Sequence, residues 1–176
     1  MKYLLIPIVK NPHYRIGPEE WQDWYRQVEK TILIAKRLKN DGDEAVIAII
    51  ANFQPKGQPS EIEIYKGAFD KLAPDLHVNY YKETRCTAEQ VERSFELQKE
   101  IGGEIIFISA WMQYPRVIYL AHGRKARHFG AFGIPSPAFA ILDPLCIIIE
   151  PLADMLRIGN FSREMIVNRR KKGKIL

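Results

Sequence analysis

The sequence predicts one Rossmann-like α/β domain with three layers, in which helices cover both faces of a mainly parallel, doubly wound sheet of about five strands. Three observations lead to this prediction: short apolar runs recur along the chain, segments of helical periodicity separate them, and polar loops join the two kinds of segment. Alternation of strands and helices favours a parallel sheet, and strands that are covered on both faces are apolar almost throughout.

Five segments are the predicted strands. They are residues 3–9, 45–51, 76–81, 104–109 and 127–132. The first two are near-continuous apolar runs, as expected for central strands of a parallel sheet.

The first predicted helix follows Pro18, a residue that suits a first helical turn. Apolar residues then recur at helical spacing, beginning with Trp21, Trp24 and Tyr25, and we expect this aromatic stripe in the core. The helix ends near residues 40–42, Asn-Asp-Gly.

Capping motifs predict where the next two helices begin. Ser60 and Glu63 have the spacing of a capping box, and Thr87 and Gln90 have the same spacing. The helix that follows Thr87 ends at Gly102-Gly103.

Prolines mark the last two predicted helices. Pro115 opens a short helix that ends at Gly123. Asp143 and Pro144 cap a final helix, which Pro151 bends.

Length and charge predict one domain with a basic end. The chain has 176 residues, which we divide into a domain at 1–160 and a basic tail at 161–176. The formal net charge is +5, and it falls to zero without the five cations Arg169, Arg170, Lys171, Lys172 and Lys174. A neutral body argues against nucleic-acid binding, because a nucleic-acid interface needs clustered cations.

The cysteines and the apolar segments predict a cytoplasmic protein. Cys86 and Cys146 form no zinc-binding pattern, so reduced cysteines are the simplest interpretation. The apolar start of the chain contains Pro7 and lacks a signal-peptide cleavage site, and no later segment is long and apolar enough to span a membrane.

Polar residues follow the predicted strands at 10–15, 52–60, 81–87 and 109–116. Ligands of parallel sheets bind at the carboxyl ends of the strands, where helix N-termini favour anions. We therefore expect a small ligand that carries a phosphate or carboxylate. The chain has neither a phosphate-binding loop nor a GxGxxG motif, so it lacks support for ordinary nucleotide-triphosphate or dinucleotide binding.

Three residues at these ends are candidates for catalysis, namely Ser109, Glu83 and Glu89, with His13 as an acid–base partner. The candidates for ligand binding are Asn11, Asn52, Glu61, Thr87, Gln113 and Arg116. Arg116 suits an anion clamp because its planar guanidinium matches phosphate and carboxylate.

Structural roles are the alternatives for several of these residues. Thr87 could cap a helix, and Glu89 could complement a helix dipole. Glu83 could pair with Arg85 on the surface, and Arg116 could pair with a carboxylate.

Two segments resemble the YdcF/SanA/ElyC-like family, a bacterial domain of unknown function, and mark the chain as a divergent member. Residues 83–90, ETRCTAEQ, are similar to its E-x-x-x-N-T-x-E-N element, and residues 105–116, IIFISAWMQYPR, to its I-L-V-T-S-x-x-H-x-x-R element. The resemblance covers roughly residues 3–157. It implies a Rossmann-like fold, a polar pocket at the strand ends, and S-adenosylmethionine or a nucleotide as the kind of ligand to test.

The chain departs from the family pattern where acid–base catalysis would need a histidine. Gln113 replaces that histidine, and an amide does not titrate near neutral pH. We expect a domain that binds a small anionic or nucleotide-like molecule, as a hydrolase or transferase or, alternatively, as an inactive binding or regulatory module. A divalent cation held by Glu61, Glu83 and Glu89 is a further hypothesis.

Overall fold

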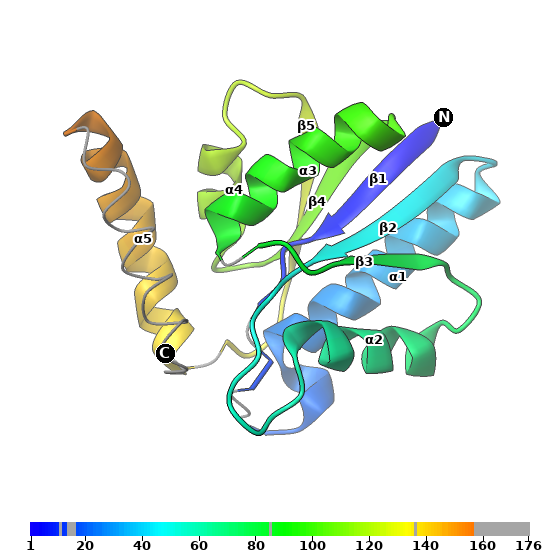
Figure 1. The fold of residues 1–176 in the computed structure, drawn as a ribbon, viewed down its shortest axis with the longest axis horizontal. Coiled ribbons are helices and arrows are strands. Elements are labelled where there is room, and N and C mark those ends of the chain that lie inside the picture. The colour runs from blue at the N-terminus through cyan, green and yellow to red at the C-terminus, as the bar shows by residue number, and fades with distance from the viewer. Residues whose placement is uncertain (11, 14–16, 85, 136, 157–176) are drawn as a thin grey trace.

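The predicted parallel sheet is confirmed in the computed structural model, which describes residues 1–10, 12–13, 17–84, 86–135 and 137–156 (Figure 1). Its strands are β1 (Lys2–Pro7), β2 (Glu44–Ile50), β3 (Val78–Tyr81), β4 (Glu104–Ala110) and β5 (Ala126–Ala131). Its helices are α1 (Asp23–Asn40), α2 (Glu61–Leu72), α3 (Thr87–Ile101), α4 (Tyr114–Leu120) and α5 (Pro137–Met155), and a short 3-10 helix, Glu19–Trp21, precedes α1. All neighbouring strands pair in parallel, in the order β3-β2-β1-β4-β5.

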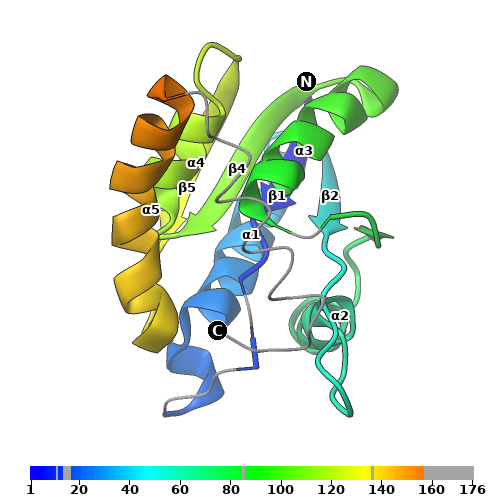
Figure 2. The same ribbon diagram turned by 60° about the vertical axis from the view of Figure 1, so that its left-hand side comes forward.

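Helices cover both faces of this sheet, as the alternation of strands and helices predicts. The chain runs outward from β1 to β3 with α1 and α2 on one face, and then returns to β4 with α3 and α4 on the other face (Figures 1 and 2). Two buried clusters result, one under α1 and α2 and the other under α3 and α4.

Alternate strand residues contribute to the two clusters. Leu5 of β1 belongs to the cluster under α1 and α2, whereas its neighbours Leu4 and Ile6 belong to the cluster under α3 and α4. Side chains of a strand point alternately to the two faces of a sheet, and here each face is covered. This double burial explains why the central strands are apolar without interruption.

The return of the chain creates a topological switch point between β1 and β4. These strands are neighbours, yet the helices that follow them lie on opposite faces of the sheet. In sheets of this kind the crevice beyond the carboxyl ends of the two strands is the usual place for a ligand. The fold therefore directs attention to the residues that follow β1 and β4.

One of the two predicted capping boxes is confirmed. The Ser60 hydroxyl accepts a hydrogen bond from the amide of Glu63, whose carboxylate in turn accepts one from the Ser60 amide. The second prediction is wrong, because Cys86 is the N-cap residue of α3 and makes no side-chain capping bond. Thr87 is already the first helical residue, and its hydroxyl instead accepts a hydrogen bond from Gln113, the residue before α4.

The predicted start of the last helix is also wrong. α5 begins at Pro137, so Pro144 and Pro151 both lie inside it. Proline at the first helical position loses no hydrogen bond, which makes Pro137 a better start than Asp143-Pro144. In both ribbon views α5 stands beside α4 at the β5 side of the sheet (Figures 1 and 2).

The aromatic stripe of the first helix is only partly buried in the core. Trp24 and Tyr25 are buried as predicted, but Trp21 is 53% exposed. Trp21 ends the 3-10 helix, and α1 begins only at Asp23, so Trp21 does not share the helical face of the other two. Its carbonyl accepts a hydrogen bond of 2.7 Å from the amide of Ile134.

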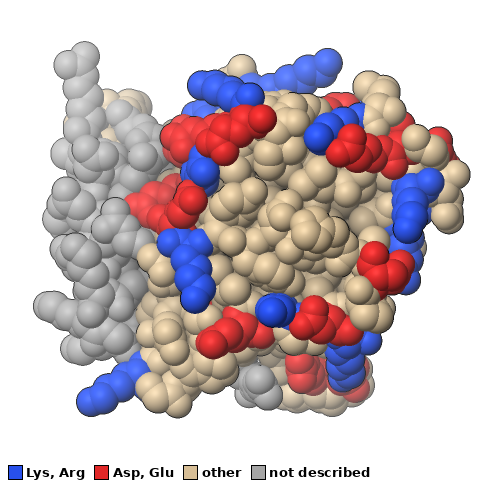
Figure 3. All heavy atoms as spheres, turned by 45° about the vertical axis from the view of Figure 1, so that its right-hand side comes forward, with Lys and Arg blue, Asp and Glu red and all other residues tan. Residues whose placement is uncertain are grey.

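Charges of both signs are interspersed on the face shown in Figure 3, as expected for a body that is neutral without its tail. Among the described helices, none has the length and hydropathy needed to cross a membrane. The division between residues 160 and 161 lies outside the described part of the chain.

Candidate functional site

Polar side chains are buried at the carboxyl edge of the sheet on both sides of the switch point. They come from the end of β4, from the residues that follow β1, β3 and β4, and from the first two turns of α1, α2, α3 and α4. Each is no more than 8% exposed: Lys10, Asp23, Gln27, Glu61, Thr84, Thr87, Gln90, Ser109, Gln113 and Arg116. Burial of polar groups costs free energy unless they are hydrogen bonded or charge paired, so such a concentration needs an explanation. We call these ten residues the buried polar layer.

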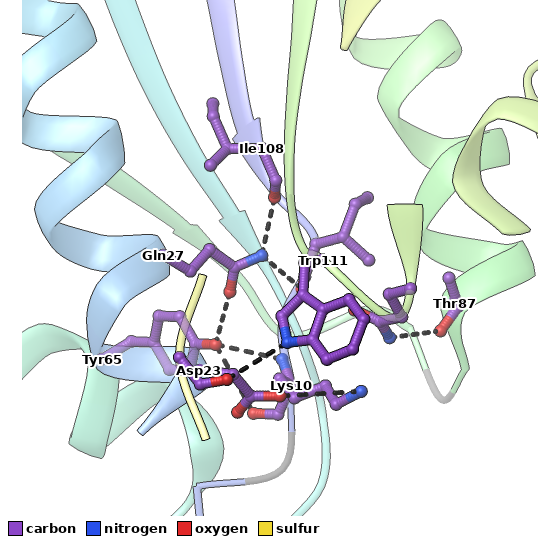
Figure 4. A network of polar contacts seen from close by, with 10 residues as sticks. Lys10, Asp23, Gln27, Tyr65, Thr87, Ile108 and Trp111 are labelled. Atoms are coloured by element: carbon purple, nitrogen blue, oxygen red, sulfur yellow. Dashed lines mark hydrogen bonds and ion pairs between the residues drawn. The ribbon is translucent and has the colours of Figure 1, made fainter. Parts of the chain in front are cut away.

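Gln27 of α1 joins the ends of β1 and β4. Its Nε2 donates to the carbonyl oxygens of Ile8, at 2.8 Å, and Ile108, at 2.6 Å (Figure 4). Its Oε1 accepts a hydrogen bond of 2.8 Å from the hydroxyl of Tyr65 in α2. Two carbonyl acceptors on one side and a hydroxyl donor on the other fix the orientation of the amide. Gln27 therefore links the ends of β1 and β4 on the face of the sheet that α1 covers.

Tyr65 connects this amide to the end of β1. Its hydroxyl oxygen accepts a hydrogen bond of 3.0 Å from the backbone amide of Lys10. Burial raises the pKa of Tyr65 well above its ordinary value, and the nearby carboxylates of Asp23 and Glu61 raise it further, while the bond from Lys10 opposes them. The hydroxyl consequently stays protonated near neutral pH and serves as a hydrogen-bond donor.

Lys10 and Asp23 bring opposite charges into the same layer. The Lys10 Nζ lies 3.8 Å from Oδ2 of Asp23, and both side chains are almost completely buried. Buried charges of this kind are stable when paired, and removing one partner is usually costly. The pair thus fixes an ammonium group and a carboxylate beside the β1 end.

A further hydrogen bond of the layer lies on the other face of the sheet, which α3 and α4 cover. Gln113, the residue before α4, donates from Nε2 to the hydroxyl of Thr87 at 3.3 Å. Among the described residues, no donor reaches Oε1 of Gln113 or Oε1 of Gln90, and both atoms are buried. These oxygens are available to accept hydrogen bonds from a bound molecule or from water.

Ser109 and Arg116 belong to the same edge. Ser109 lies in β4, opposite Gly130 of β5, and Arg116 lies in the first turn of α4 after Pro115. Arg116 is 6% exposed, so its planar cation is held in a largely dry environment. Charge-assisted hydrogen bonds to carboxylate or phosphate are strong in such surroundings.

An aromatic pair borders the layer. Trp111, directly after β4, donates from Nε1 to the carbonyl of Gly133 at 3.2 Å and stacks on Phe132 with a centroid distance of 6.4 Å. Gly133 is pressed against the α1 start, since a Cβ there would lie 2.6 Å from the Asp23 Cα. In Figure 4 the indole of Trp111 lies between the Lys10–Asp23 pair and Thr87.

Three other residues that the sequence predicted for the site are described by the structure but are not members of the buried polar layer. Asn52 is exposed at the end of β2, and Glu89 is half-buried in the first turn of α3. Glu83 is exposed and forms an ion pair with Arg93 of α3, which also contacts Glu100 at 2.7 Å. Asn11 lies outside the described residues, as does the Arg85 partner suggested for Glu83.

Lys10, Asp23, Gln27 and Tyr65 are members of the site that sequence reasoning missed. One signal was available for Gln27. It occupies the same helical face as the buried residues Trp24, Val28 and Thr31, where a polar side chain is unexpected. No comparable signal marks Tyr65, which looks like an ordinary apolar position of α2.

Metal binding finds no support within the described ranges. No group of three or more histidine, cysteine, aspartate or glutamate side chains there could hold a metal ion. The carboxylates of the cation hypothesis differ in environment, because Glu61 is buried, whereas Glu83 is exposed and paired with Arg93.

A shallow hollow at the opposite, amino edge of the sheet is a weaker candidate. Lys2 and Glu104 line it, and both make surface ion pairs, Lys2 with Glu44 at 3.0 Å and Glu104 with Arg127 at 3.0 Å. Half-buried charges that are already paired at the surface do not by themselves indicate a ligand.

The fold and the buried polar layer define the class of this protein: a doubly wound, parallel α/β domain with polar side chains gathered at its switch point. No protein-family model matches the chain, and no curated protein or solved structure matches it either.

Proposed function

We propose that this protein binds a small anionic or nucleotide-like molecule at the carboxyl edge of its sheet. The observation that carries the proposal is the buried polar layer itself, gathered at the switch point where parallel sheets usually bind ligands. If the role of these residues were purely structural, apolar side chains would stabilise this edge of the sheet better, because burying polar groups and charges costs free energy.

The chemistry of the layer supports an anion with hydrogen-bond donors. Arg116 and Lys10 place two cationic groups there, and the Oε1 atoms of Gln113 and Gln90 are buried acceptors. A ligand with a carboxylate or phosphate beside a hydroxyl or amino group would complement both features.

Binding is better supported than acid–base catalysis. Gln113 lies at the position where the resembled family has a histidine, and a glutamine amide cannot exchange protons near neutral pH. Hydrolase or transferase activity would depend on Ser109, which is buried in β4, and Ser109→Ala tests this directly.

A thermal-shift screen tests the binding proposal. The panel comprises carboxylates, sugar phosphates, nucleotides and S-adenosylmethionine. A ligand present at 100 times its Kd stabilises a protein by about 2.7 kcal/mol, which raises Tm by roughly 5 to 10 °C at this size. We expect at least one class of anion to raise Tm in this way.

Two variants locate the effect. Arg116→Gln and Gln113→Leu should each abolish the response, whereas Arg124→Gln, which alters an exposed arginine after α4, should preserve it. The proposal fails if no anion stabilises the wild type, or if both site variants respond as the wild type does.

A further inference from the structure

A seven-residue pattern repeats along α5. Proline begins each repeat, and the three successive segments over residues 137–156 read PAFAILD, PLCIIIE and PLADML. Apart from Ala138, the second and fifth positions hold large apolar residues at intervals of four, three, four and three: Ile141, Leu145, Ile148, Leu152 and Met155. Intervals that alternate between three and four residues define a narrow seam along which two helices pack. We call these five residues the α5 stripe.

The α5 stripe is exposed along its whole length. Its side chains are between 45% and 71% exposed, and Ile149 and Leu156 beside it are 48% and 61% exposed. Ala153, in contrast, is buried and Cys146 is half-buried, so a different side of α5 packs toward the body. In both ribbon views α5 stands at the margin of the fold beside α4 (Figures 1 and 2). A contiguous exposed apolar surface of this kind marks an interaction site.

The exposed apolar surface of α5 is large enough for a specific interface. An aliphatic side chain of four heavy atoms presents roughly 130 Å² of apolar surface when it is fully exposed. The seven side chains of the stripe and its two neighbours, at their observed exposures, present roughly 500 Å² per copy. Two copies that pack through this surface bury roughly 1,000 Å² together, which is about the area at which specific interfaces begin.

The charges of α5 are compatible with two stripes in contact. Asp143 and Glu150 end the first two repeats, a position on the opposite side of the helix from the stripe. No charged residue occupies a stripe position, so two stripes can meet without burying a charge. Residues 137–156 contain no lysine or arginine, whereas helices that lie on anionic membranes are rich in these cations. The helix therefore fits a partner helix better than a lipid surface.

We propose that α5 packs against α5 of a second copy of this chain through the α5 stripe. In a two-fold dimer the same surface serves both partners, so a helix with a repeating seam complements itself. Ile148 is the third of the five stripe residues and lies at the middle of the seam. The two Ile148 side chains are therefore neighbours at the two-fold axis, whether the helices run parallel or antiparallel.

Light scattering coupled to size-exclusion chromatography tests the proposal on the full chain. We expect the wild type to have the mass of two copies at about 50 μM, because association depends on protein concentration. Ile148→Glu places a carboxylate at the middle of the seam and should weaken association by roughly tenfold or more. Leu33→Glu is the matched control, since Leu33 of α1 and Ile148 are both 62% exposed, and it should leave the mass unchanged.

Cross-linking is a second test, and its variant keeps the seam free of charge. Ile148→Cys should join two copies in the presence of a short bifunctional maleimide, because the two introduced thiols are neighbours in the proposed pair. Leu33→Cys is the control and should give no more cross-linked product than the wild type. The wild type itself, which contains Cys86 and Cys146, gives the background.

Three results overturn the proposal. The wild type has the mass of one copy at about 50 μM; or Ile148→Glu associates as tightly as the wild type; or Ile148→Cys cross-links no more than Leu33→Cys does. A wild-type monomer that floats with vesicles of phosphatidylcholine and phosphatidylglycerol would assign the stripe to a lipid surface instead. No stripe residue belongs to the buried polar layer, so the ligand screen above is a separate test.

Discussion

The amide of Gln27 and the hydroxyl of Tyr65 share a hydrogen bond of 2.8 Å between two helices, inside the carboxyl edge of the sheet. Through this bond α1 and α2 are fixed relative to the ends of β1 and β4, whose carbonyls accept from the same amide. These contacts within the chain hold the polar side chains in place, and a site that is already ordered loses less entropy on binding.

Replacing Gln27 should therefore destabilise the protein. Gln27→Leu keeps the approximate volume but removes three buried hydrogen bonds, namely those from Gln27 to the carbonyls of Ile8 and Ile108 and the one from the Tyr65 hydroxyl. We expect the free energy of unfolding to fall by about 2–4 kcal/mol, measured by urea titration. Gln54→Leu on an exposed loop is the control and should change it by less than about 0.5 kcal/mol. Equal effects of the two changes would show that the Gln27 contacts contribute little.

Two glycines should respond in opposite directions to alanine. A Cβ at Gly133 would lie 2.6 Å from the Asp23 Cα and 2.7 Å from its backbone nitrogen, so Gly133→Ala must move backbone. We expect a loss of about 2 kcal/mol or more in unfolding free energy. Gly67→Ala in α2 meets nothing within 4 Å and should add about 0.5–1 kcal/mol. A neutral Gly133→Ala would contradict the close approach of these segments.

His128 should make stability depend on pH. Burial lowers the pKa of this half-buried imidazole beside Phe107, so the folded state holds the proton less tightly than the unfolded state does. Its contribution is present above the unfolded value of about 6.5 and is lost as pH falls through the lower folded value. His128→Gln should therefore reduce the stability difference between about pH 7.5 and about pH 5.5. An NMR titration that gives His128 a pKa above its ordinary value would contradict this prediction.

Glu83 should behave as a surface ion-pair residue. It is exposed and pairs with Arg93, and exposed pairs couple weakly. A double-mutant cycle of Glu83→Ala and Arg93→Ala should give a coupling below about 1 kcal/mol that decreases at high salt. Once a ligand is found, Glu83→Ala should preserve the thermal shift. Loss of that shift would restore Glu83 to the site predicted from the sequence.

The fold and one side of the site follow from local patterns. Apolar runs that alternate with helical periodicity predicted the parallel sheet, and the strand-end rule predicted Ser109, Gln113 and Arg116, which the structure buries at one edge. Glu83 satisfied the same rule, but its carboxylate is directed to Arg93 instead. Proximity to a strand end does not decide which way a side chain points.

The sequence by itself determined the order of the elements, because periodicity and turn residues act over short distances along the chain. Only the tertiary structure decided which polar residues meet. Lys10 and Tyr65 are 55 positions apart, and Gln27 and Ile108 are 81 apart, yet each pair is hydrogen bonded. These contacts depend on helix packing across the switch point, which no local pattern encodes. The same holds for α5, whose side chains Ile141, Leu145 and Ile148 are exposed because of where the helix packs.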